Sequence, residues 1–108
     1  GMVSPKHFLY KNSFKHIGYC MSKSSVIIMT KYLATLYAKN FNINSVVLGG
    51  VITKNIDKQF VKNYSMISPK KRMMTSNETS GIFEYLLSDK SSYANGGVFT
   101  IDGGWTSW

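Results

Sequence analysis

Residues 19–50 read YCMSKSSVIIMTKYLATLYAKNFNINSVVLGG and contain the two elements that decide the fold. Over 19–41 no glycine or proline interrupts, and apolar residues recur at helical spacing at positions 26, 29, 33, 36 and 37. Further apolar residues at 27, 28 and 32 widen this stripe, so the predicted helix must be covered on two sides, by a sheet and by another helix or subunit. The apolar run 45–48, stopped by Gly49-Gly50, is typical of a buried parallel strand.

The remaining sequence predicts two shorter helices and a second strand. Apolar residues between positions 56 and 64 fall at helical spacing and predict a helix near 55–65. Thr75 and Glu78 have the spacing of a capping box, which predicts a helix from there to about position 87. A last apolar run over 98–101, after a pair of glycines, predicts a short strand.

The predicted order is therefore helix, strand, helix, helix, strand. Two apolar strands joined by a helical crossover favour a right-handed parallel unit. A parallel pair alone is not a stable sheet, since it needs cover on both faces and further strands. We expect an α/β chain that forms part of a larger doubly wound, Rossmann-like fold and is completed by oligomerisation. Residues 1–108 form one partial domain in this interpretation, with an irregular lead-in over 1–18 that includes a turn at Asn12-Ser13.

Composition excludes several classes of protein. The chain has 108 residues, enough for one domain, and no apolar run near the ~20 residues of a membrane-spanning helix. A single cysteine, Cys20, excludes an internal disulfide, and we expect it to be a small buried hydrophobe. The histidines do not have metal-ligand spacing, so no metal site is expected. The N-terminus lacks the pattern of a secretory signal, which predicts a cytoplasmic protein.

The charge balance favours an anionic partner. Thirteen Lys and Arg against five Asp and Glu give a net charge of +8, which keeps a nucleic-acid-binding module as an alternative. The lysines are nevertheless spread along the chain, and only residues 70–72 (KKR) form a local cluster. We expect this cluster to be a solvated segment, and a single arginine argues against nucleic acid. Trp105 and Trp108 are expected to pack against the core or a neighbouring subunit.

Tyr19 and Lys23 are the candidates for chemistry. They are four residues apart at the start of the predicted helix and therefore share one face. An ammonium beside a phenol stabilises the phenolate and lowers the pKa of the phenol, which makes a tyrosine usable as a general acid or base. With this many tyrosines and lysines, chance supplies the spacing about once, so the pair alone is weak evidence.

Several motifs in order are more specific than the pair. Residues 19–23 (YCMSK), 48–53 (LGGVIT, preceded by Asn44-Ser45), 86–89 (LLSD), 96–97 (GG) and 101–105 (IDGGW) together resemble the short-chain dehydrogenase/reductase family. The resemblance covers roughly residues 3–106. It implies the C-terminal half of an NAD- or NADP-dependent oxidoreductase that interconverts a carbonyl and an alcohol on a small-molecule substrate.

The resemblance also implies residue roles. Tyr19 would be the acid/base, and Lys23 would lower its pKa and bind the nicotinamide ribose. Gly49, Val51 and Thr53 would line the nicotinamide end of the cofactor, and the stretch after Thr53 would be the mobile lid over the substrate. In the family, the helix that begins at the tyrosine commonly pairs across a dimer interface.

The departures from the family pattern are equally informative. Leu48 replaces the usual proline and Asn42 the usual arginine, and the chain contains no glycine-rich turn to hold a pyrophosphate. Ser4 is not expected to be the family's catalytic serine. We therefore expect that the isolated chain neither binds the cofactor tightly nor turns over. A non-catalytic, oligomerising fragment is the second alternative, because removal of the other strands exposes apolar surface.

Overall fold

A computed structural model describes residues 1–10 and 13–108, so Asn12 of the predicted turn lies outside the described residues. Its main elements are three helices and two strands: α1 (Ile17–Leu36), β1 (Ser45–Leu48), α2 (Lys58–Ile67), α3 (Ser80–Leu86) and β2 (Val98–Ile101). Short 3-10 turns add His7–Leu9 before α1, Ser76–Thr79 before α3 and Asp89–Ser91 after it. The order of helices and strands confirms the sequence prediction.

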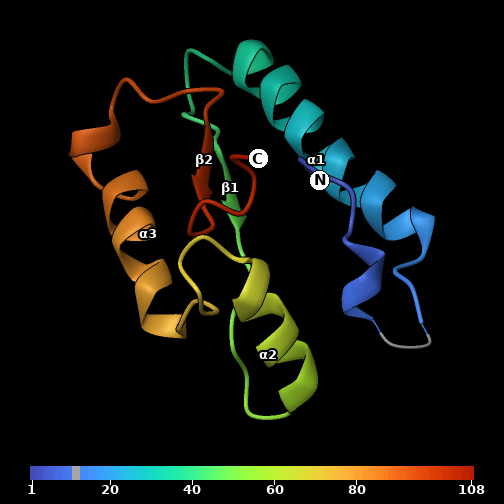
Figure 1. The fold of residues 1–108 in the computed structure, drawn as a ribbon. Coiled ribbons are helices and arrows are strands. Elements are labelled where there is room, and N and C mark those ends of the chain that lie inside the picture. The colour runs from blue at the N-terminus through green and yellow to red at the C-terminus, as the bar shows by residue number, and fades with distance from the viewer. Residues whose placement is uncertain (11–12) are drawn as a thin grey trace.

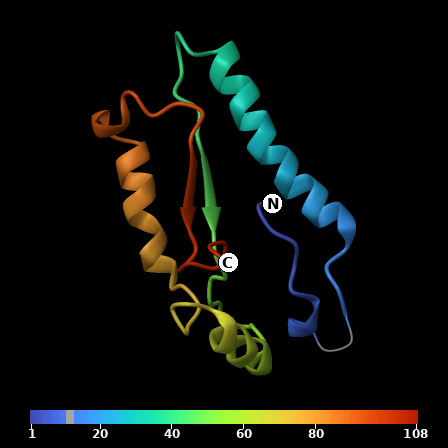
Figure 2. The ribbon, with the colours of Figure 1, turned by 45° about the horizontal axis from the view of Figure 1, so that its top comes forward.

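The two strands form a parallel sheet in which Ser45 pairs with Val98 and Leu48 with Ile101. Figures 1 and 2 show both strands between α1 and α3, with α2 beyond the ends of the strands. This arrangement confirms the predicted α/β class and the parallel pairing across a helical crossover. The N–H groups of Ser45 and Gly49 point toward β2, where they bond the carbonyls of Gly97 and Ile101 at 3.0 and 2.9 Å.

The long helix α1 is shorter at its C-terminus than predicted. It ends at Leu36, and the N–H groups of Asn40 and Phe41 both bond the carbonyl of Tyr37 in a tight turn. No glycine or proline marks this end. The turn is fixed from outside, because the side chain of Asn95 donates to the Ala34 carbonyl at 2.9 Å and accepts from the Ile43 N–H.

The shorter helices have side-chain caps. Asp57 begins α2, its carboxylate accepting the Phe60 N–H at 2.7 Å, and the helix ends at Ile67 just before Ser68-Pro69. At the next helix start, the Glu78 carboxylate accepts the Thr75 N–H at 2.9 Å, as the capping-box spacing predicted. The first turn there is a 3-10 helix, and α3 proper begins four residues later than Ser76.

The core is small and lies at one end of the sheet, where the strands end. Leu9, Tyr64 and Met73 are buried there, with a shell of half-buried apolar residues that includes Phe60 and Trp105. The predicted lead-in is therefore structured in part, because the His7–Leu9 turn contributes a core residue.

The outer face of α1 remains exposed. The helix buries only Thr30 and Ala34 among its side chains, whereas its large apolar side chains on the outside are more than half exposed: Ile17, Met21, Ile28, Met29, Tyr32 and Leu36. The predicted cover on one side of this helix is thus the sheet. Its other side has no cover from the part of the chain that the structure describes.

Candidate active site at Tyr19

Tyr19 and Lys23 lie on one face of α1, as their spacing predicted. The Lys23 ammonium lies 5.7 Å from the centroid of the Tyr19 ring. Both side chains line a hollow of about 300 Å³ between α1 and β1, whose other walls are Gly1, Val26, Ile27 and residues 45–48. The hollow thus combines the Lys23 ammonium, a phenol and a largely apolar wall formed by the helix and the strand.

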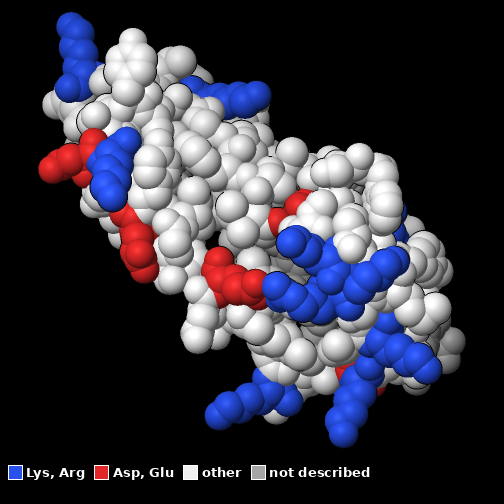
Figure 3. Space-filling view, turned by 60° about the vertical axis from the view of Figure 1, so that its left-hand side comes forward, with Lys and Arg blue, Asp and Glu red and all other residues white. Residues whose placement is uncertain are grey.

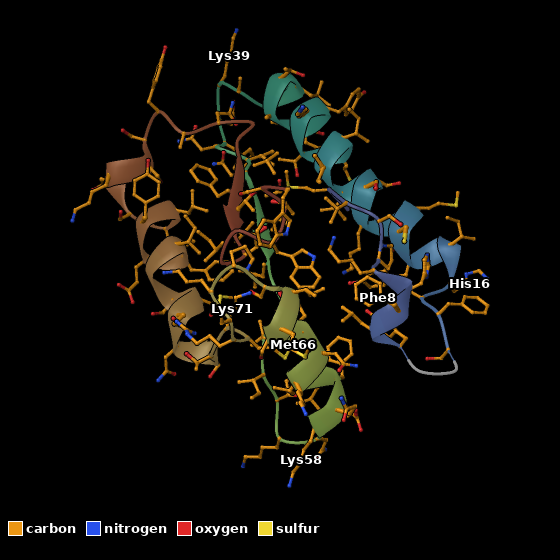
Figure 4. The ribbon with its side chains drawn as sticks, viewed as in Figure 1. Phe8, His16, Lys39, Lys58, Met66 and Lys71 are labelled. Carbon is orange, nitrogen blue, oxygen red and sulfur yellow. The ribbon has the colours of Figure 1, made fainter. Side chains whose placement is uncertain are left out.

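Tyr19 also lines a second cleft, of about 200 Å³, on the side of the core. The walls of this cleft come from the N-terminal turn, α2 and the segments that follow each strand, and the residues that bear on the site are Ser4, Lys6, Tyr10, Lys15, Cys20, Gly50, Phe60, Tyr64 and Trp105. In Figure 4 the side chains of this region lie between the turn that carries Phe8, the start of α1 at His16 and the helix α2 that carries Met66. Tyr19 therefore lines two hollows, one with a largely apolar wall beside Lys23 and one with aromatic walls.

Gly50 and Tyr64 connect the end of β1 to α2. The Gly50 N–H donates to the Tyr64 hydroxyl at 2.9 Å, and the Tyr64 ring stacks on Trp105 with centroids 4.1 Å apart and planes 3° apart. A Cβ on Gly50 would lie 2.8 Å from the Tyr64 ring and 2.9 Å from the Met73 methyl group, so a larger residue here would require these side chains to shift. Burial, and secondarily the Asp102 carboxylate, raise the pKa of Tyr64, although the Gly50 N–H favours its phenolate.

Asp102 fixes the loop that carries Trp105. Its carboxylate accepts the Gly104 N–H at 2.8 Å, the Thr106 N–H at 2.9 Å and the Thr106 hydroxyl at 2.7 Å. Gly103 and Gly104 adopt positive φ values of 65° and 86°, which favour glycine. The motif IDGGW is thus a turn that places an indole on Tyr64, and the prediction that Trp105 packs on the core is confirmed.

The predicted nicotinamide-side residues lie in the segment after β1. Gly49 approaches the β2 end so closely that a Cβ would lie 2.8 Å from the Asp102 Cα. Val51 forms a parallel bridge with Met74, whose N–H bonds the Gly50 carbonyl at 2.9 Å and whose carbonyl accepts the Ile52 N–H at 2.8 Å. Thr53 is exposed. Of this segment, Gly50 shares the core-side cleft with Tyr19, whereas Gly49, Val51 and Thr53 do not line it.

An ion pair holds the strand-like segment around Met74. The Arg72 guanidinium donates to both carboxylate oxygens of Glu78, at 2.7 and 2.6 Å. This hydrogen bond, together with those from Thr75, lowers the pKa of Glu78 to about 2. The arginine of the 70–72 cluster is thus engaged with a carboxylate, and the Lys71 ammonium donates to the Met66 carbonyl at 3.0 Å. Figure 3 shows the basic side chains of this face in separate groups, with acidic side chains beside some of them.

The remaining residues that the sequence singled out lie as follows. Cys20 is half-buried in the core-side cleft, and Ser4 lines the same cleft with its hydroxyl near its own chain, 3.5 Å from the Pro5 carbonyl. Asn42, which replaces the family's arginine, donates to the Ser92 carbonyl at 2.9 Å. Trp108 is exposed.

Two classes of feature are absent from the described residues. No group of three or more His, Cys, Asp or Glu residues is placed to hold a metal ion within 1–10 and 13–108. No helix among these residues has both the length and the apolar character needed to cross a bilayer.

Sequence reasoning missed Lys6, Lys15 and Tyr64 as site residues. The Lys6 ammonium lies 5.8 Å from the Trp105 ring centroid, and the Lys15 ammonium 5.6 and 5.4 Å from those of Tyr10 and Tyr19. Lys6 approaches a ring from the other end of the chain, which no local spacing records, whereas the rings near Lys15 are only four and five residues away and the i, i+4 spacing of Lys15 and Tyr19 could have suggested that contact. For Tyr64, the apolar spacing predicted the helix but gave no sign that its hydroxyl reaches Gly50.

Comparison with known proteins identifies the class to which this fold and site belong. Residues 11–106 match the sequence model of the family described as enoyl-(acyl carrier protein) reductase. The chain belongs to the short-chain dehydrogenase/reductase family, as the motifs predicted.

Its relatives are longer proteins. It is 38% identical over 98 residues to the NADH-dependent L-xylulose reductase of Ambrosiozyma monospora and 36% identical over 96 residues to an uncharacterized oxidoreductase of Schizosaccharomyces pombe. These alignments cover 83% and 88% of this chain but only 36% and 37% of the relatives. A solved short-chain dehydrogenase from Leptospira borgpetersenii with bound NAD⁺ superposes with a TM-score of 0.77 at 35% identity, over 82% of this chain and 35% of that one. The chain thus spans little more than a third of the length of these proteins.

Proposed function

We propose that this chain carries the catalytic tyrosine and the nicotinamide-side wall of an NAD(P)-dependent oxidoreductase that interconverts a carbonyl and an alcohol. The observation that carries the proposal is the position of Tyr19, which lines two hollows at once. One hollow contains Lys23 and an apolar wall, and the other contains Gly50 and an aromatic wall. A general acid or base must contact the substrate while the cofactor lies beside it. Tyr19 could do so with the cofactor in the Lys23 hollow and the substrate in the hollow that contains Gly50.

The residues of the Lys23 hollow fit the nicotinamide end of the cofactor. Val26, Ile27 and the 45–48 strand offer an apolar surface to a planar ring, and the Lys23 ammonium offers donors to ribose hydroxyls. When bound, the cofactor supplies or accepts the hydride. Tyr19 holds the proton at its phenolic oxygen and gives it to the substrate oxygen in reduction, and the Lys23 ammonium lies 5.7 Å from the centroid of its ring.

The isolated chain is proposed to be inactive. Hydride transfer requires the cofactor to be positioned against the substrate, and a glycine-rich turn for the pyrophosphate is not present in this sequence. We expect the nicotinamide end alone to bind weakly, with a dissociation constant on the order of millimolar.

A titration of the ¹⁵N-labelled chain tests this function. Nicotinamide mononucleotide should shift the amide signals of Lys23 and of residues 45–48, which line the same hollow, and Lys23→Met should abolish these shifts. Lys31→Met, a lysine on the same helix outside the hollow, is the matched control and should leave them intact. Shifts that persist in Lys23→Met would overturn the assignment of this hollow, and micromolar affinity for NAD or NADP would overturn the proposed inactivity.

We also propose that the chain assembles through the outer face of α1. Six large apolar side chains there are more than half exposed, and burying them removes apolar area from water at roughly 25 cal/mol per Å². Ile28→Lys places a charge in the middle of this face and should shift the chain toward the monomer in light scattering. Lys31→Glu, which also changes charge on α1, is the control. A wild-type chain that is monomeric at micromolar concentration would refute this assembly.

The basic surface gives the nucleic-acid alternative little support. The basic groups in Figure 3 are separate, and the guanidinium of Arg72 is paired with Glu78. Steeply salt-dependent binding to a mixed-sequence oligonucleotide would be the evidence for that alternative.

A further inference from the structure

The core-side cleft beside Tyr19 has a charge pattern that the proposed reaction does not require. Of the residues that line it, Lys6 and Lys15 carry charged side chains, and none is Asp or Glu. Lys6 is half-buried. Proton and hydride transfer to a neutral carbonyl needs neither of these cations, since Lys23 already lies beside Tyr19 in the other hollow.

The two ammonium groups contact rings and not carboxylates. Lys6 lies against Trp105, and Lys15 lies between Tyr10 and Tyr19, at 5.4 to 5.8 Å from the ring centroids. Among residues 1–10 and 13–108 neither lysine forms a salt bridge. Such contacts hold each cation in place by the ring quadrupole and leave its N–H donors available to a ligand.

Two carboxylates belong to segments that form the cleft. Asp102 influences Tyr64, but its carboxylate is occupied by three hydrogen bonds within its own loop. Asp57 lines a different cleft, which shares Tyr10 and Phe60 with this one, and it caps α2. Neither carboxylate lines the cleft that holds the lysines, so a bound anion there meets positive charge without a competing acid.

We propose that this cleft binds a substrate that carries an anionic group, a carboxylate or a phosphate, held by Lys6 and Lys15 while its carbonyl or alcohol carbon faces Tyr19. The inference rests on the proposed function for the identity of the reacting group. The aromatic rings of Tyr10, Phe60 and Trp105 line the cleft beside the two lysines, and ionic contacts are stronger beside apolar groups than in bulk water. Lys15 also lies against the Tyr19 ring, so the anionic end and the reacting carbon of the substrate are held within one short molecule.

The test compares matched pairs of carbonyl compounds by their effect on the amide signals of the labelled chain. 2-Oxobutyrate and 2-butanone differ in a carboxylate, and dihydroxyacetone phosphate and dihydroxyacetone differ in a phosphate. The anionic member of at least one pair should shift Lys6, Gly50 and Tyr64, and its neutral partner should not. The pair whose anionic member shifts these signals shows whether the cleft binds a carboxylate or a phosphate.

Variants separate the site from general attraction to a basic protein. Lys6→Met and Lys15→Met should each weaken binding about tenfold, whereas Lys39→Met, at the far end of α1 in Figure 4, should not. Equal weakening by Lys39→Met, or equal binding of the neutral partner, would overturn the proposal. The two proposals can fail separately, because a wild-type chain that binds the anion but shows no nicotinamide mononucleotide effect would refute the proposed function alone.

Discussion

Removing the Tyr64 hydroxyl is the sharpest test of how the core holds the segment after β1. Tyr64→Phe keeps the ring on Trp105 but leaves the Gly50 N–H, now 2.9 Å from a hydroxyl, without its acceptor. An unsatisfied buried donor costs about 1–3 kcal/mol, and because Gly50 is only half-buried we expect the lower part, about 1–2 kcal/mol. Tyr64→Ala also removes the ring and should cost about 3–5 kcal/mol.

The assay is urea unfolding followed by circular dichroism, with the free energy of unfolding extrapolated to water. Tyr93→Phe is the matched control, since that side chain is fully exposed and its hydroxyl should contribute less than about 0.5 kcal/mol. Hydrogen exchange at the Gly50 amide should accelerate in Tyr64→Phe and not in the control. If the two phenylalanine variants have equal stability and equal Gly50 exchange, the hydroxyl does not anchor this segment and the reasoning fails.

Three further predictions follow from described contacts. Gly50→Ala should destabilise the fold by about 1–3 kcal/mol in the same urea assay, because its Cβ would lie 2.8 Å from a ring already fixed against Trp105; an unchanged midpoint would show that the ring yields. Asp102→Asn should weaken the turn that carries Trp105 and broaden its indole N–H signal, while Asp89→Asn, an exposed acid, should leave that signal unchanged. The lowered pKa of Glu78 means that its contribution to stability is present above pH 4.5 and is lost as pH falls toward 2, so Glu78→Gln should flatten the pH dependence of the urea midpoint in that window; a parallel profile would contradict the ion pair.

Local sequence signals predicted the elements better than their contacts. The strand 45–48 is bounded as predicted, because Gly49 approaches β2 too closely to carry a side chain. The apolar spacing predicted α2 near 55–65, whereas the helix spans Lys58–Ile67, because the Asp57 carboxylate caps its start and Pro69 disfavours its continuation. The predicted end of α1 was wrong, because the observed end is fixed by a hydrogen bond from Asn95, far along the chain.

The candidate site likewise contains one contact that the sequence predicted and others that it did not. Tyr19 and Lys23 are four residues apart, so helix geometry alone brings them together. Lys6, Tyr64 and Trp105 meet only through the tertiary fold, and no spacing in the sequence records their approach. Residue roles at Gly49, Val51 and Thr53 stay predictions, because the close backbone contacts of this segment do not show what it binds.

The outward edge of β1 has a consequence for how the sheet can be extended. Alternate residues of a strand direct their peptide groups to opposite edges, so Val46 and Leu48 face away from β2, and within the described residues no strand meets them. That edge also forms a wall of the hollow that contains Tyr19 and Lys23. Any segment that docks on these peptide groups arrives beside the Tyr19 phenol in the same step, so extension of the sheet and enclosure of this hollow are coupled.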